Sequence, residues 1–328
     1  MKTTKVVRVP GKLMIAGEYS VLFGGQALAY TVDTYLELEA SVSDDQHFHI
    51  SSEYWDDECV VENLQDLVVP SVQKPLIHAL AHAQKTFGND PLKICVHSKL
   101  DRSAGMGTSS AVILAACAAS QMFGQRGDLN DCAPVAIQVQ KSLQGHASGY
   151  DILTQFHGGL VLIQGPRARG EAEVLRRYIK PYPEIYPFAG GQGSATGPLI
   201  QETLKHFEAD ASFKKDFLAS SSQLVEALLK HWKDGNASTR SQVFSINRDH
   251  RELSLSVLQA PSALVRSLKS LKGCDRDWTF KTTGAGGEDS LLFFGEEAKL
   301  QEAFELMKAE SWYPLNAGFT HEGLSLRG

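Results

Sequence analysis

The sequence predicts an α+β protein made of one large or two medium domains. Its 328 residues exceed the length of a small domain. Strand-like and helix-like segments are mixed without the strict alternation of a doubly wound parallel sheet. Residues 28–42 run apolar or alternate, with Leu36 and Leu38 on one face and Glu37 and Glu39 on the other. This pattern is typical of a half-buried antiparallel strand.

The other elements follow from periodicity and from glycine and proline. The expected strands are 5–9, 28–42, 91–97, 160–163, 278–281 and 290–294, and the expected helices are 72–87, 111–123, 134–143, 199–234, 252–272 and 296–310. Residues 47–50 are the expected hairpin partner of the strand over 28–42. Residues 165–200 are rich in glycine and proline, which favours a crossover there. We therefore expect domains over residues 1–180 and 181–328.

Composition argues against several classes of protein. The net charge is −6 without a Lys/Arg run, so no nucleic-acid partner is expected. The N-terminus lacks the apolar region of a signal peptide, and no stretch approaches the roughly 20 apolar residues of a membrane span. The five cysteines do not have zinc or redox spacing. We expect reduced thiols in a cytoplasmic protein, without a membrane partner.

The strongest chemical signal precedes the alanine-rich helix over 111–123. The segment consists of Ser103, Ala104, Gly105, Met106, Gly107, Thr108, Ser109 and Ser110. Glycines allow close approach of a ligand, and the first amides of a helix are unpaired at its electropositive end. The segment therefore predicts a phosphate-binding loop. The alternative is a helix simply capped by Thr108 or Ser109. Neither a Walker P-loop nor a Rossmann fingerprint is present.

Three other segments combine glycine with polar residues. They are Val9–Tyr19, Gln144–Asp151 and Lys281–Asp289. In the first, Lys12 lies among apolar and turn residues, where a solvated lysine is less expected. In the second, Asp151 follows a glycine loop, although an Asx turn would also explain a carboxylate there. The third has more glycine than a hairpin turn needs, which favours close approach of a ligand.

These segments, in this order, resemble the GHMP kinase superfamily. Pro10–Lys12 with Gly17–Tyr19 is similar to its first motif, Gly105–Ser110 to its second and Gly284–Gly287 to its third. The resemblance spans most of the chain. It implies a ribosomal protein S5 domain 2-like N-terminal domain and a ferredoxin-like C-terminal domain, with ATP and a small-molecule acceptor in the cleft between them. A monomer or homodimer is expected.

The resemblance also implies roles for single residues. Lys12 would neutralise charge on the transferred phosphoryl group, and Asp151 would orient or deprotonate the attacking oxygen. Residues 103–110 would hold ATP, with Mg²⁺ at Ser109. Gln140 lies where some relatives supply a metal-binding Glu. The expected acceptor-binding residues are Glu18, Tyr19, Ser148, Gly149, Gly284, Ala285 and Gly286. Candidates for a substrate phosphate are Arg8, Arg102, Arg248 and Lys281.

Within the superfamily, several details resemble the phosphomevalonate kinases. Tyr19 stands where mevalonate kinases usually have His, and Gln144–Asp151 is similar to the phosphomevalonate kinase loop. Gly193–Thr196 is a looser match. The expected reaction converts phosphomevalonate to diphosphomevalonate in isoprenoid biosynthesis. However, Glu288 replaces a glycine and adds negative charge, and Ser148–Asp151 also fits the mevalonate kinase pattern.

Other activities therefore stay open. Mevalonate kinase or another kinase of the superfamily is the nearest alternative. Diphosphomevalonate decarboxylase is a lyase on the same fold, and the Gly17–Tyr19 element weighs against it. A non-catalytic binding relative is the last alternative, and intact Lys12, Ser109 and Asp151 weigh against it.

Overall fold

The computed structural model describes residues 3–53, 55, 58–67, 70, 73–167, 171–190, 196–255, 257, 261–284 and 290–327. Within these ranges, the strands are β1 (Lys5–Ala16), β2 (Gln26–Val42), β3 (Phe48–Ser52), β4 (Cys59–Val61), β5 (Leu92–Ser98), β6 (Leu160–Gln164), β7 (Glu173–Tyr178), β8 (Ile185–Ala189), β9 (Trp278–Thr282), β10 (Ser290–Gly295), β11 (Tyr313–Pro314) and β12 (Ser325–Arg327). The α-helices are α1 (Lys74–Phe87), α2 (Thr108–Met122), α3 (Cys132–Gln144), α4 (Tyr150–His157), α5 (Thr196–Ala209), α6 (Ala211–Asp234), α7 (Ala237–Ser254), α8 (Ser262–Ser270) and α9 (Glu297–Ala309).

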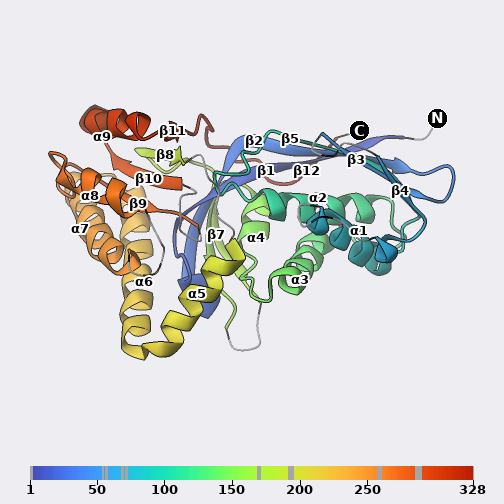
Figure 1. Ribbon diagram of the computed structural model, residues 1–328, viewed down its shortest axis with the longest axis horizontal. Helices are drawn as coiled ribbons and strands as arrows, with labels where there is room; N and C mark the ends of the chain where they lie inside the picture. Colours follow the sequence, from blue (N-terminus) through green and yellow to red (C-terminus); the bar gives the residue numbers. More distant parts are fainter. Residues whose placement is uncertain are drawn as a thin grey trace.

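The larger sheet has the strand order β12-β1-β2-β5-β3-β4, with β6 on β2 and β7 on β6. All of these pairs are antiparallel except β3 with β5. Helices α1 to α4 lie below this sheet in Figure 1. Buried apolar side chains of β2, β5, α1 and α2 form its core. The predicted α+β class is confirmed, and the alternation seen over 28–42 is the inner and outer face of β2.

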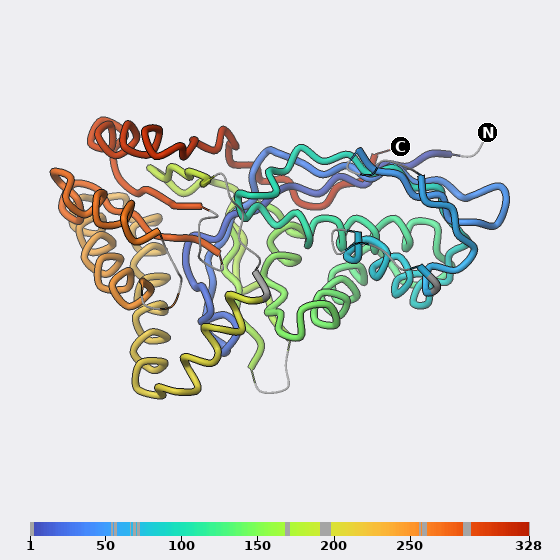
Figure 2. Tube along the Cα trace, in the orientation of Figure 1, coloured from blue at the N-terminus to red at the C-terminus, as the bar shows by residue number. Residues whose placement is uncertain are grey.

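The smaller sheet has the order β11-β8-β10-β9 and is wholly antiparallel. Its core gathers the aromatic side chains of Phe188, Trp278, Phe280 and Phe293. Figure 2 shows the trace of this part, with α9 on one side and α6 to α8 on the other. Strand β12 returns to the larger sheet and pairs with β1. The division at residue 180 stays a prediction.

Two predictions about elements are wrong. Strand β3 is not the partner of β2, because β5 occupies that edge of β2 over Leu36–Val42 and β3 pairs with β5 instead. The helix expected over 252–272 is replaced by the end of α7 and by α8. Much of α7 was missed because its buried face is largely polar, with Asn247, His250 and Arg251 among its buried residues.

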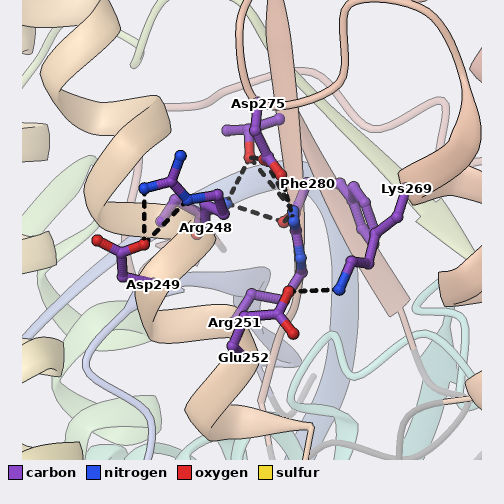
Figure 3. A network of polar contacts seen from close by, with 9 residues as sticks. Arg248, Asp249, Arg251, Glu252, Lys269, Asp275 and Phe280 are labelled. Atoms are coloured by element: carbon purple, nitrogen blue, oxygen red, sulfur yellow. Dashed lines mark hydrogen bonds and ion pairs between the residues drawn. The ribbon is translucent and has the colours of Figure 1, made fainter.

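A polar network fastens α7 to β9 (Figure 3). The Arg251 guanidinium donates to both carboxylate oxygens of Asp275, at 3.1 and 2.5 Å, and to the carbonyl oxygen of Phe280 at 3.1 Å. Its side chain is 2% exposed. Asn247 donates to Thr279 Oγ1 and to the Phe280 carbonyl. Because a buried guanidinium is costly without its carboxylate, this pairing fixes the position of β9.

None of the described helices has the length and apolar character needed to cross a bilayer.

Removing the buried carboxylate tests the network. Asp275→Ala leaves the Arg251 guanidinium buried and unpaired, so we expect a loss of about 3–5 kcal/mol in unfolding free energy. The control is Lys269→Ala, which breaks the exposed ion pair with Glu252 and should cost less than about 1 kcal/mol. Denaturant unfolding of both variants measures the difference. Equal losses would contradict the role of this network.

Candidate active site

A cleft of about 440 Å³ opens beside the N-terminal end of α2. Four segments supply polar groups to its wall. They are Lys12 with Glu18, the loop Gly105–Ser110, Gln140, and the group of Ser148, Tyr150 and Asp151. One part of the wall is apolar and comprises Leu36, Trp55, Pro75, Leu76, Val96 and Val112. The cleft therefore joins an apolar compartment to a charged one.

An ion pair between the buried Lys12 and the partly exposed Asp151 is the centre of the charged part. Lys12 Nζ lies 2.7 Å from Asp151 Oδ1 and donates to the Tyr150 hydroxyl at 2.9 Å and to the Gly105 carbonyl at 3.1 Å. Burial lowers the pKa of Lys12, but the Asp151 carboxylate and the Tyr150 oxygen outweigh it and hold that pKa above its ordinary value. Lys12 is therefore a fixed cation at neutral pH.

Backbone irregularity in β1 places this lysine. The register between β1 and β2 shifts between Pro10 and Gly11, as in a β-bulge, which redirects the side chains that follow. The Lys12 amide then donates to the Met106 carbonyl at 3.0 Å instead of to a strand partner. Strand β1 and the loop before α2 are thus joined at Lys12.

Asp151 comes from the first turn of α4, where the helix dipole favours a carboxylate. Gly149 precedes this helix with φ 78°, and a Cβ on it would lie 3.0 Å from the Ile137 side chain. Gln140 of α3 donates to Asp151 Oδ2 at 3.4 Å. Lys12 and Gln140 thus contact different oxygens of one carboxylate, which fixes its orientation.

The predicted phosphate-binding loop ends at the tip of α2. Gly107 is the N-cap residue, with φ 74° and no side-chain cap. The alternative in which Thr108 or Ser109 caps this helix is therefore wrong. A Cβ at Gly107 would lie 2.8 Å from Cε of Lys12, so a glycine is needed for both conformation and space. The first-turn amides of a helix lack partners within the helix and favour an anion, and residues of the α2 tip line the cleft.

Glu18 and Tyr19 follow β1 and line the same cleft. Glu18 is 1% exposed and forms an ion pair with Lys281 of β9. Burial raises the pKa of Glu18, and the Lys281 ammonium opposes that rise. Tyr19 packs edge-on against Phe207 and Phe217, and burial raises its pKa to about 12. Its phenol therefore stays neutral.

Other predicted residues have different positions. Ser148 and Gly284 line the cleft. Ser103 instead donates to Asp101, and Ala104 is fully buried. Ala285, Gly286 and Glu288, like Gly193–Ala195, lie outside the described residues.

Of the four basic residues predicted to bind a substrate phosphate, one lines the cleft and three do not. Arg102 lines the cleft. Arg8 pairs with Glu37 and Glu322 on the larger sheet, and Arg248 pairs with Asp249. Lys281 is held by Glu18 and is not among the residues that line the cleft.

Gln155 is a residue that the sequence did not reveal. Its side chain is fully buried in α4 and donates to the carbonyls of Pro10 and Gly107, at 3.0 and 3.1 Å. It therefore joins the strand of Lys12, the phosphate-binding loop and the helix of Asp151. In the sequence, a glutamine among the apolar residues of this helix was the signal that could have indicated it. Trp55 lines the cleft, and Trp278 lies in the core of the smaller sheet.

The sequence and the fold are similar to those of known proteins. Residues 74–159 match the family described as GHMP kinases N terminal domain. A mevalonate kinase of Thermococcus sibiricus is 24% identical over 97% of this chain and 96% of its own length. The solved Lin0012 protein from Listeria innocua has a TM-score of 0.80 at 17% identity, covering 99% of both chains. Streptococcus pneumoniae phosphomevalonate kinase, solved with phosphomevalonate and AMPPNP, has a TM-score of 0.76 at 17% identity, covering 96% of this chain and 99% of that one.

The likeness to these solved structures shows that the chain has the fold of small-molecule kinases such as phosphomevalonate kinase. The chain is thus similar to proteins of the GHMP kinase superfamily, through the domain match over residues 74–159 and through its likeness to a mevalonate kinase over nearly its whole length.

A single methyl group tests the close approach at Gly107. Gly107→Ala places a Cβ against Lys12, so we expect nucleotide affinity to fall at least about tenfold. Gly88→Ala is the matched control, because Gly88 ends α1 with φ 71° and has no atom within 4 Å of its Cβ position. Both variants carry similar backbone strain. Titration calorimetry with ATP should show weakened binding only in the first variant.

Proposed function

We propose that this protein transfers the γ-phosphoryl group of ATP to phosphomevalonate. The observation that carries the proposal is the ion pair of Lys12 and Asp151, 2.7 Å apart, beside the tip of α2. A fixed cation and a fixed carboxylate at a helix N-terminus suit a transfer that depends on positioning and on charge stabilisation.

ATP fits the two compartments of the cleft. The apolar wall with Trp55 and Leu76 suits the adenine base. The loop Gly105–Ser110 and the first amides of α2 suit the phosphates. Mg²⁺ prefers oxygen ligands, and Ser109 lines the same cleft as Gln140, whose buried Oε1 has no hydrogen-bond partner. Bound Mg²⁺ would neutralise phosphate charge, with Ser109 as its protein ligand and Gln140 Oε1 as a further oxygen.

A phosphorylated acceptor is compatible with the neutral side chain of Gln140. An acceptor phosphate is already ionised, so its oxygen attacks the γ-phosphorus without losing a proton, the bond from that phosphorus to the bridging oxygen breaks, and ADP leaves. Asp151 then positions the acceptor rather than deprotonating it. Lys12 stabilises charge on the transferred group. Gln140 adds no second carboxylate that would repel a phosphorylated acceptor.

Mevalonate is the second candidate acceptor. The Thermococcus sibiricus protein, which matches 97% of this chain, is named a mevalonate kinase. With a hydroxyl acceptor, Asp151 would take the proton as the oxygen attacks, and Tyr150 would stay a donor because burial holds its pKa above the ordinary value.

Steady-state assays with both acceptors test the proposal. We expect kcat/KM to be at least about tenfold higher with phosphomevalonate than with mevalonate. A preference for mevalonate would support the second candidate. Release of carbon dioxide from diphosphomevalonate with ATP would indicate the decarboxylase. Absence of turnover with every acceptor would leave only a binding protein.

Two single substitutions test the catalytic pair. Lys12→Met and Asp151→Asn should each lower kcat by at least about 100-fold, because each removes a charge next to the transferred group. Lys85→Met is the control, since Lys85 is exposed at the end of α1. Thermal unfolding shows whether each variant is folded. Near-normal kcat in a folded Lys12→Met variant would place the chemistry elsewhere.

A further inference from the structure

Lys281 is a buried cation outside the cleft. Its side chain is 4% exposed, its ammonium pairs with Oε1 of Glu18, and it also donates to the Thr282 carbonyl at 2.6 Å. Lys281 thus contacts a residue of the cleft wall, although it does not line the cleft itself. Since a buried ammonium needs its partner, the pair constrains both β9 and the loop after β1.

The network behind β9 holds this lysine in place. Arg251 and Asn247 donate to the carbonyl of Phe280, the residue that precedes Lys281. Figure 3 shows Arg251 reaching from α7 to Asp275 and Phe280. The backbone of Lys281 is therefore anchored by groups other than Glu18, so the lysine can fix the glutamate.

Glu18 retains one unused oxygen. Its Oε2 is buried without a hydrogen-bond partner, and the residue lines the cleft. Tyr19 lies next to it, and its phenol is neutral. His250 lies near Lys281 with both ring nitrogens unpartnered, and burial lowers its pKa to about 3, so it carries no charge. Lys281 is the cation that balances Glu18 in this cluster.

We propose that Lys281 is a positioning residue for the acceptor: it holds the Glu18 carboxylate so that Oε2 accepts a hydrogen bond from an acceptor hydroxyl group. The inference rests on the proposed function. Mevalonate and its phosphate both carry a hydroxyl group and a carboxylate. Paired with Lys281, Glu18 can accept from the hydroxyl without presenting a net negative charge to the acceptor carboxylate. An unpaired glutamate there would repel it.

Kinetic constants of four variants test this role. Lys281→Met should raise KM for the acceptor at least about tenfold and change KM for ATP less than about twofold. Glu18→Gln should have a similar effect. The double variant Glu18→Gln/Lys281→Met buries no unpaired charge, and we expect its acceptor KM to be no higher than that of the worse single variant, because both act through one contact. Lys269→Met, which breaks an exposed Lys–Glu pair, should match the wild type.

The outcomes separate this inference from the proposed function. Absence of wild-type turnover with either acceptor overturns the proposed function and the acceptor role with it. Wild-type turnover, with acceptor KM unchanged in Lys281→Met or in the double variant, overturns the positioning role alone. A parallel rise of both KM values would indicate a merely structural pair and would also overturn it. If Lys281→Met does not fold, the charge-balanced double variant and Glu18→Gln decide by the same criterion.

Discussion

The contact between the buried Lys12 and Asp151 is the constraint around which the elements beside the larger sheet are arranged. Two opposite charges removed from water are stable only when their geometry and their remaining hydrogen bonds are well satisfied. The Tyr150 hydroxyl and the Gly105 carbonyl accept the other hydrogen bonds of the lysine ammonium, and Gln140 donates to the second oxygen of Asp151. Strand β1, the loop before α2, α3 and α4 must therefore all be in place before the charges can be accommodated.

This constraint explains residues that carry no charge. Gly107 leaves room for the Lys12 side chain, and Gly149 lets α4 begin against Ile137. Gln155 bonds the carbonyls of Pro10 and Gly107, so that three segments distant in sequence share one side-chain amide. The position of the α2 tip relative to Lys12 is thus set by packing and by backbone hydrogen bonds, and any anion at that tip meets a preformed site.

Local patterns in the sequence were sufficient for the α+β class and for most strands and helices, because alternation, alanine content and glycine act over short distances. The glycine motifs also indicated Lys12, Asp151 and the loop over 105–110, which the structure brings together. The pairing of strands distant in sequence could not be predicted: β5 rather than β3 lies beside β2. Polar burial was equally hidden, since Arg251, Gln155 and Lys281 resemble surface residues until their partners are known.

The pairing of β12 with β1 has a consequence for folding during synthesis. Val6 and Arg327 are register partners although 320 positions separate them. On the ribosome, the outer edge of β1 therefore exposes unpaired amides and carbonyls until β12 has emerged. Contacts of such separation form slowly. A nascent chain of this protein must keep that edge from pairing with a neighbour, which makes the interval before β12 emerges the period when aggregation is most expected.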